Sequence, residues 1–82
     1  MNITGKTDDS NDTGKRIMYT VELAENKFVD VMNCMDQDNL FYVMELGDGK
    51  CVYDADGKSL NFSINEEKII NFVRRKQNEF NV

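Results

Sequence analysis

Hydrophobic and polar residues alternate most regularly over residues 40–53, LFYVMELGDGKCVY. The dipeptide Asp48-Gly49 interrupts this alternation, and Asp-Gly between two alternating segments is typical of a two-residue β-hairpin turn. With these two residues in the turn, Met44 would pair with Tyr53. Because side chains alternate along a strand, one face of the hairpin would then carry Leu40, Tyr42, Met44, Leu46, Cys51 and Tyr53.

Two further segments upstream have the pattern of strands. Residues 16–23, RIMYTVEL, alternate cleanly, which indicates a half-buried strand. Residues 28–35, FVDVMNCM, fit either a helix with one apolar stripe or a strand bounded by polar residues. A strand would place Asp30 on one face with Phe28 and Met32, which argues against it. The regular spacing of strand starts along the chain nevertheless favours the strand.

A helix is predicted over residues 64–79. Ser63 and Glu66 have the spacing of a capping box, in which each side chain accepts a hydrogen bond from a backbone N–H at the helix entrance. Acidic residues in the first turn and the basic run 74–76 near the end match the two ends of the helix dipole. The expected buried stripe consists of Ile69, Phe72, Val73 and Phe80.

These elements predict the α+β class, with an antiparallel sheet of three or four strands and a C-terminal helix packed on one face. The hairpin 40–53 would lie at the centre of this sheet, and residues 54–57 would form a turn after it. Residues 1–15 hold a single large apolar residue after the first Met, so a disordered tail is expected there. Residues 16–82 would form a single small domain.

The amino-acid composition limits the kinds of catalytic and metal-binding site that the chain can form. The 82 residues include no His, which removes the commonest metal ligand and the usual acid–base group at neutral pH. Residues 54–57 resemble the start of a calcium-binding loop, but the later ligand positions do not fit. Cys34 and Cys51 lie in apolar segments and are expected to be reduced, buried thiols. We expect no enzyme activity, no cofactor, no metal and no membrane segment, and a cytoplasmic location.

The predicted sheet has more apolar surface than one helix can cover. The face opposite the helix would carry large apolar side chains among carboxylates, a composition typical of partner surfaces. The surface predicted to bind another protein comprises Met18, Glu22, Phe41, Val43, Glu45, Val52 and Asp54. A second helix over residues 24–36, the tail, or a second copy of the chain in a homodimer could cover this face instead.

The net charge of −5 suits a partner protein with a basic surface and disfavours nucleic acid. The first hypothesis is therefore a small acidic inhibitor or adaptor that masks a partner's surface. Ten Asn residues and no Pro suggest an AT-rich coding sequence, which would suit a phage or mobile-element protein acting on a host enzyme or defence factor. The alternative is a dimeric nucleic-acid-associated regulator that uses Arg74, Arg75 and Lys76. A structural subunit that pairs through an open sheet edge is a third possibility.

Overall fold

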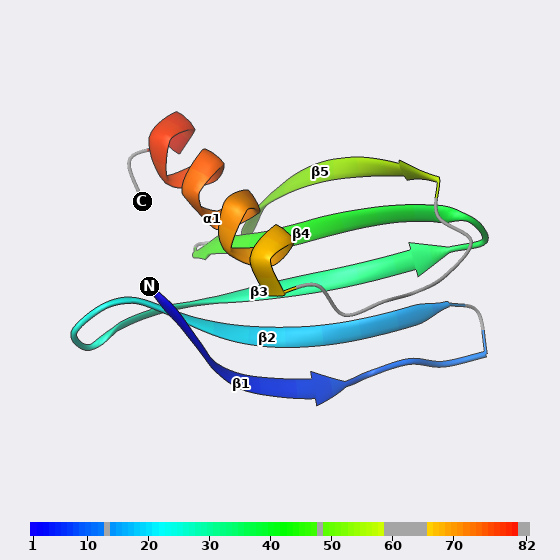
Figure 1. Ribbon diagram of the computed structural model, residues 1–82, viewed down its shortest axis with the longest axis horizontal. Helices are drawn as coiled ribbons and strands as arrows, with labels where there is room; N and C mark the ends of the chain where they lie inside the picture. The colour runs from blue at the N-terminus through cyan, green and yellow to red at the C-terminus, as the bar shows by residue number, and fades with distance from the viewer. Residues whose placement is uncertain (13, 48, 59–65, 81–82) are drawn as a thin grey trace.

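The computed structural model describes residues 1–12, 14–47, 49–58 and 66–80. Its five strands form one antiparallel sheet in which each strand pairs with its neighbours in sequence order, β1-β2-β3-β4-β5. The strands are β1 (Asn2–Asp8), β2 (Lys15–Ala24), β3 (Lys27–Asp36), β4 (Asn39–Gly47) and β5 (Lys50–Lys58). One helix, α1 (Glu66–Phe80), follows and lies across a single face of the sheet (Figure 1). The α+β class is confirmed, with five strands rather than the three or four predicted.

Strands β2, β3 and β4 form the centre of the sheet. Residues 28–35, for which both helix and strand were open, lie within β3. Short turns link these strands, and Asn26 and Gln37 in the turns adopt positive φ angles of 60° and 55°. Asn tolerates this left-handed conformation better than most residues, so the residue at the β2–β3 turn suits its position.

The amino-terminal segment differs from the predicted disordered tail. Asn2–Asp8 forms the edge strand β1, which pairs with β2 from Asn2 opposite Glu22 to Asp8 opposite Ile17. Ile3 is half-buried and packs against the core, and the other residues gain mainly backbone hydrogen bonds to β2. Because such pairing depends little on side-chain hydrophobicity, the apolar pattern did not indicate this strand.

The hairpin of β4 and β5 exists, but its register differs from the prediction. The pairing shifts between Glu45 and Gly47, so that Glu45 lies opposite Cys51 and Met44 lies opposite Val52. Gly47 has a φ of 88°, which glycine adopts without steric cost and which is typical of a β-bulge. The shift by one residue moves Cys51, Val52 and Tyr53 to the opposite face from the one predicted.

Strand β5 also continues through residues 54–57, which were predicted to form a turn. Gly57 has a positive φ of 79°, but the strand extends past it to Lys58. The Asp and Gly residues that suggested a turn therefore lie on an edge strand. Carboxylates are tolerated on this strand because the helix above it supplies cations, as described below.

Helix α1 covers the sheet with a stripe of side chains that includes three predicted core residues, Ile69, Phe72 and Val73. Phe80, the fourth, is 50% exposed, and Lys76 is buried instead. The predicted capping residue Ser63 lies outside the described residues. Together with the sheet the helix encloses one core, which consists of Ile17, Tyr19, Val21, Val31, Leu40, Tyr42, Met44, Ile69, Phe72 and Val73.

Candidate functional site

The sheet has two faces, and the described helix α1 packs on only one of them (Figure 1). The opposite face, here called the outer face, is formed by the strand residues that alternate with the core. The register of β2 to β5 aligns them in rows across the sheet. The outer face comprises Arg16, Met18, Thr20, Glu22, Phe28, Asp30, Met32, Cys34, Phe41, Val43, Glu45, Cys51, Tyr53 and Ala55.

Large apolar side chains on the outer face are accessible to solvent. Phe28 is 51% exposed and Tyr53 is 60% exposed. The rings of Phe41 and Tyr53 pack together with their centroids 5.7 Å apart, which joins strands β4 and β5 through side chains. Because large exposed apolar patches are uncommon on monomeric proteins, this face is the strongest candidate for a binding surface.

A shallow groove of about 160 Å³ lies in the outer face. Met18, Met32 and Val43 come from three adjacent strands and stand opposite one another in the register, so they form a continuous apolar floor. The carboxylates of Asp30 and Glu45 lie beside this floor, together with Cys51. The groove therefore combines flexible methionines, which adapt to different partner shapes, with negative charge at one side.

Five of the seven predicted binding residues lie on the outer face. Met18, Glu22, Phe41 and Val43 are half-buried there, and Glu45 is exposed.

The predicted placement of Val52 and Asp54 on this face is wrong, because the bulge in the hairpin turns both side chains toward α1. Val52 packs against the core, and Asp54 binds side chains of the helix. Their places on the outer face are taken by Cys51 and Tyr53, which the predicted register had buried.

The prediction also missed Asp30 and Met32. The strand interpretation of residues 28–35 already placed these two side chains on one face with Phe28. A carboxylate on that face argued against a strand only if the face was buried. In the structure it is the outer face, where a carboxylate beside apolar side chains remains in contact with solvent.

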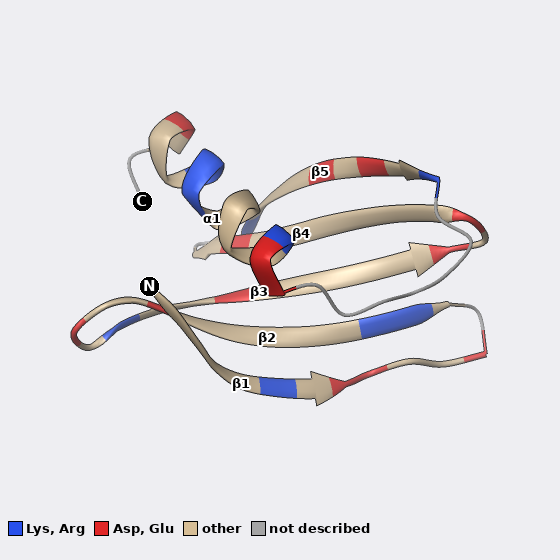
Figure 2. Ribbon diagram, viewed as in Figure 1, with Lys and Arg blue, Asp and Glu red and all other residues tan. Residues whose placement is uncertain are grey.

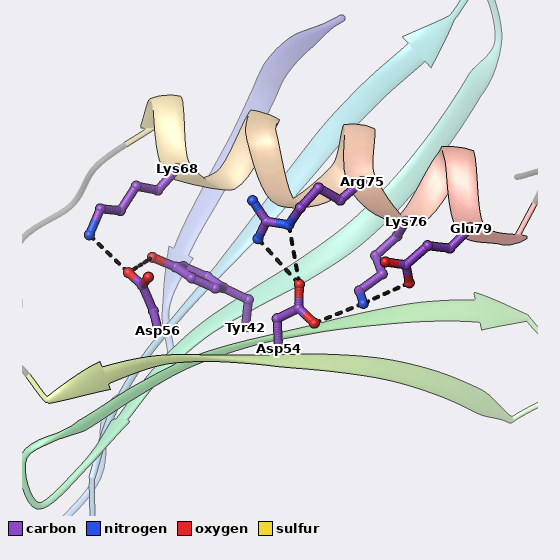
Figure 3. Close-up of polar contacts among 7 residues, drawn as sticks. All are labelled: Tyr42, Asp54, Asp56, Lys68, Arg75, Lys76 and Glu79. Carbon is purple, nitrogen blue, oxygen red and sulfur yellow. Dashed lines mark hydrogen bonds and ion pairs between the residues drawn. The ribbon is translucent and has the colours of Figure 1, made fainter.

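A polar network holds the helix against β5 on the other side of the sheet (Figure 3). Both oxygens of the Asp54 carboxylate are used: Lys76 Nζ lies 2.8 Å from Oδ1, and Arg75 Nη2 lies 3.2 Å from Oδ2. Lys76 also contacts Glu79 at 3.1 Å. Hydrogen bonds from Lys76 and Arg75 hold the pKa of Asp54 below its usual value, and the bond to Asp54 raises the pKa of Lys76.

The same network continues at Asp56. Lys68 Nζ lies 2.8 Å from the Asp56 carboxylate, and the Tyr42 hydroxyl donates to it at 3.1 Å. The pKa of Asp56 is lowered by the bond from Lys68 and then by the bond from Tyr42. Burial raises the pKa of Tyr42, and its bond to the carboxylate raises it further. Figure 2 shows these acidic positions of β5 and the basic positions of α1.

The α1–β5 network occupies two of the three basic residues on which the nucleic-acid alternative depends. It consists of Tyr42, Asp54, Asp56, Lys68, Arg75, Lys76 and Glu79. Of the predicted cluster, Arg74 is exposed, whereas Arg75 and Lys76 share the Asp54 carboxylate. The Lys76 side chain is 7% exposed. Its ammonium therefore faces its own chain rather than a phosphate in solution.

The two thiols differ from the prediction that both are buried. They are unpaired, and Cys34 is buried whereas Cys51 is exposed. Burial raises the pKa of the Cys34 thiol. Within the described ranges, no group of three or more His, Cys, Asp and Glu side chains is arranged to hold a metal ion. No helix in the part of the chain that the structure describes has the length and apolar character needed to cross a bilayer.

Comparison of the chain with protein-family models, with curated proteins and with solved structures finds no match.

Proposed function

We propose that this protein is a small acidic, non-catalytic binding protein that acts as an inhibitor or adaptor by masking a surface of a partner protein. The observation that supports the proposal is the apolar outer face, which has exposed Phe28 and Tyr53 and a groove lined by other residues of the same face. We further propose that it is a phage or mobile-element protein that acts on a host enzyme or defence factor, since ten Asn residues and no Pro suggest an AT-rich coding sequence.

The energetics favour occupation of this face. Full burial of one large apolar side chain contributes roughly 1.5–3 kcal/mol. The outer face offers two strongly exposed aromatic residues and several half-buried apolar ones. Aromatic anchors of this kind commonly dominate the affinity of protein interfaces. Covering them would supply several kcal/mol toward the cost of association.

The rest of the fold suits such a role because it supports the outer face from behind. The core and the α1–β5 network fix the helix to the opposite side of the same strands. Side chains on regular strands need little reordering when a partner arrives, which lowers the entropic cost of binding. The acidic net charge of −5 would speed the encounter with a basic partner.

Affinity capture with matched variants tests the proposal. The tagged protein is incubated with lysate of its host treated with nuclease, and the retained proteins are identified by mass spectrometry. We expect Phe41→Lys combined with Val43→Lys to lose the specific partner, and Tyr53→Lys to weaken its capture. Tyr53 is strongly exposed, so its replacement should leave the fold intact.

The control adds the same positive charge elsewhere. Asn71→Lys combined with Asn78→Lys changes two exposed positions of α1, which lies on the other face. This control should retain the partner, and all variants should keep the circular dichroism spectrum of the parent. Equal capture by the parent and both outer-face variants would show that the outer face is not the binding surface.

A further inference from the structure

The groove in the outer face carries negative charge that no ion pair among the described residues neutralises. Asp30 and Glu45 lie side by side along one side of the apolar floor. All ion pairs among the described residues lie in the α1–β5 network, so neither carboxylate has a cationic partner there. Thr20 donates a hydrogen bond to Asp30 at 3.4 Å but brings no charge. Two carboxylates beside an apolar groove form a site that a cation next to an apolar side chain would complement.

We infer that the groove receives a basic amphipathic segment of the partner protein, in which an apolar side chain is neighboured by Lys or Arg. This inference rests on the proposed function and specifies the chemistry of the partner. The apolar side chain enters the floor formed by Met18, Met32 and Val43, and the cation lies between Asp30 and Glu45.

The spacing within β3 defines which segments fit. Asp30 and Met32 are two residues apart on one strand, so their side chains emerge roughly 7 Å apart. Neighbours on one face of an extended segment, at positions i and i+2, have the same separation. Positions i and i+4 of a helix are about 6 Å apart along its axis. An extended segment with an apolar residue at position i and Lys or Arg at position i+2 therefore matches the groove most directly, because both side chains lie on one face.

A second copy of the chain fits the groove less well. Two outer faces placed against each other would bring the carboxylates of Glu22, Asp30 and Glu45 from both copies into one interface. Each copy would add one cation on this face, Arg16, which lies opposite Cys34, against these three carboxylates. Like charges at an interface oppose association. The charge of the groove thus selects a basic partner over self-association.

The exposed thiol of Cys51 allows the groove to be probed directly. In a Cys34→Ala variant, Cys51 is the single thiol, and its alkylation by a maleimide reports whether the groove is covered. The probes are three capped heptapeptides with Ser at every even position, whose odd positions, which share one face of an extended chain, carry in turn Leu and Lys, Leu and Glu, or Ser and Lys. At saturating concentration we expect the Leu/Lys peptide to slow alkylation at least fivefold, while the other two peptides leave the rate unchanged.

A charge exchange provides the stricter test. Asp30→Lys combined with Glu45→Lys should abolish protection by the Leu/Lys peptide and create protection by the Leu/Glu peptide. The matched control, Asp12→Lys combined with Asp38→Lys, makes the same charge change at two exposed positions away from the groove and should behave like the parent. Each variant is compared with itself without peptide, so that changes in thiol reactivity cancel.

Three results would overturn the inference. Protection by the Leu/Glu peptide equal to that by the Leu/Lys peptide would remove the need for a cation. Absence of protection by any peptide would show that the groove does not receive such a segment. Protection that grows with protein concentration alone would assign the groove to a second copy. The proposed function is judged separately, because loss of the captured partner in the Tyr53→Lys variant would still support the outer face.

Discussion

Removal of the Asp54 carboxylate should destabilise the protein more than removal of its partner Lys76. Asp54 accepts hydrogen bonds from both Lys76 and Arg75, and its carboxylate lies closer to the buried Lys76 ammonium than that of Glu79 does. Asp54→Ala leaves that ammonium with Glu79 alone, whose side chain is 52% exposed. Lys76→Met instead removes the buried charge and keeps an apolar stem beside the ring of Phe72.

The exposure of the two side chains determines how much the variants should differ in free energy of unfolding. Exposed ion pairs contribute about 0.2–1 kcal/mol, whereas a buried charge that loses its partner costs about 3–5 kcal/mol. The Lys76 side chain is 7% exposed and that of Asp54 is 28% exposed, so this pair lies between the two cases. We expect Asp54→Ala to lower the free energy of unfolding by about 2 kcal/mol and Lys76→Met by less than about 1 kcal/mol. The double variant should cost no more than Asp54→Ala alone.

Urea unfolding followed by far-ultraviolet circular dichroism at pH 7 measures all four proteins of this cycle. With a slope of about 1 kcal/mol per molar urea for a small domain, the midpoint of Asp54→Ala should fall by about 2 M. The slopes should stay equal across the four proteins. A larger loss in Lys76→Met than in Asp54→Ala, or strictly additive losses, would refute the assignment of Lys76 as a buried cation that depends on Asp54.

Three further measurements test other parts of the structure. The pKa values of Asp54 and Asp56 are lowered in the folded state, so their stabilisation is complete above the unfolded value of about 3.9 and is lost as the pH falls through the folded values. The free energy of unfolding should therefore decrease between pH 5 and pH 2, and less steeply when both residues are Asn; an equal slope would contradict the network. In the native protein a maleimide should label Cys51 quickly and Cys34 only after unfolding, as peptide mass spectrometry can determine; equal rates would contradict their placement. Gly47→Ala should lower the free energy of unfolding by about 1 kcal/mol in urea titrations, because φ is 88° and no atom lies near the added methyl group; an unchanged midpoint would contradict the bulge.

Much of the fold follows from the hydrophobic pattern. Alternation over residues 16–23 and 40–46 predicted two central strands, and the stripe of Ile69, Phe72 and Val73 predicted the packed side of α1. These segments bury one complete face, so that packing and local pattern agree. The pattern also placed Met18 and Val43 on the face opposite the helix, where the structure has them.

The remaining features depend on the backbone more than on side-chain pattern. Strand β1 is stabilised by backbone hydrogen bonds to β2, which an apolar pattern does not record. The sequence did not distinguish a regular hairpin from one with the extra residue of the bulge at Gly47, because Asp-Gly is compatible with both. The network at Asp54 could not be expected while that residue was assigned to the opposite face.

One backbone feature therefore determines the character of both faces. With a regular register, Asp54 and Asp56 would point away from α1, and the helix would lose the carboxylates that hold Lys68 and Lys76. Tyr53 would then lie beneath the helix rather than 60% exposed beside Phe41. The extra residue at the bulge moves the carboxylates to the helix and the apolar side chains to the outer face. The same shift that holds the helix to β5 thus leaves an apolar surface that none of the described elements covers, and such a surface suits the proposed binding role.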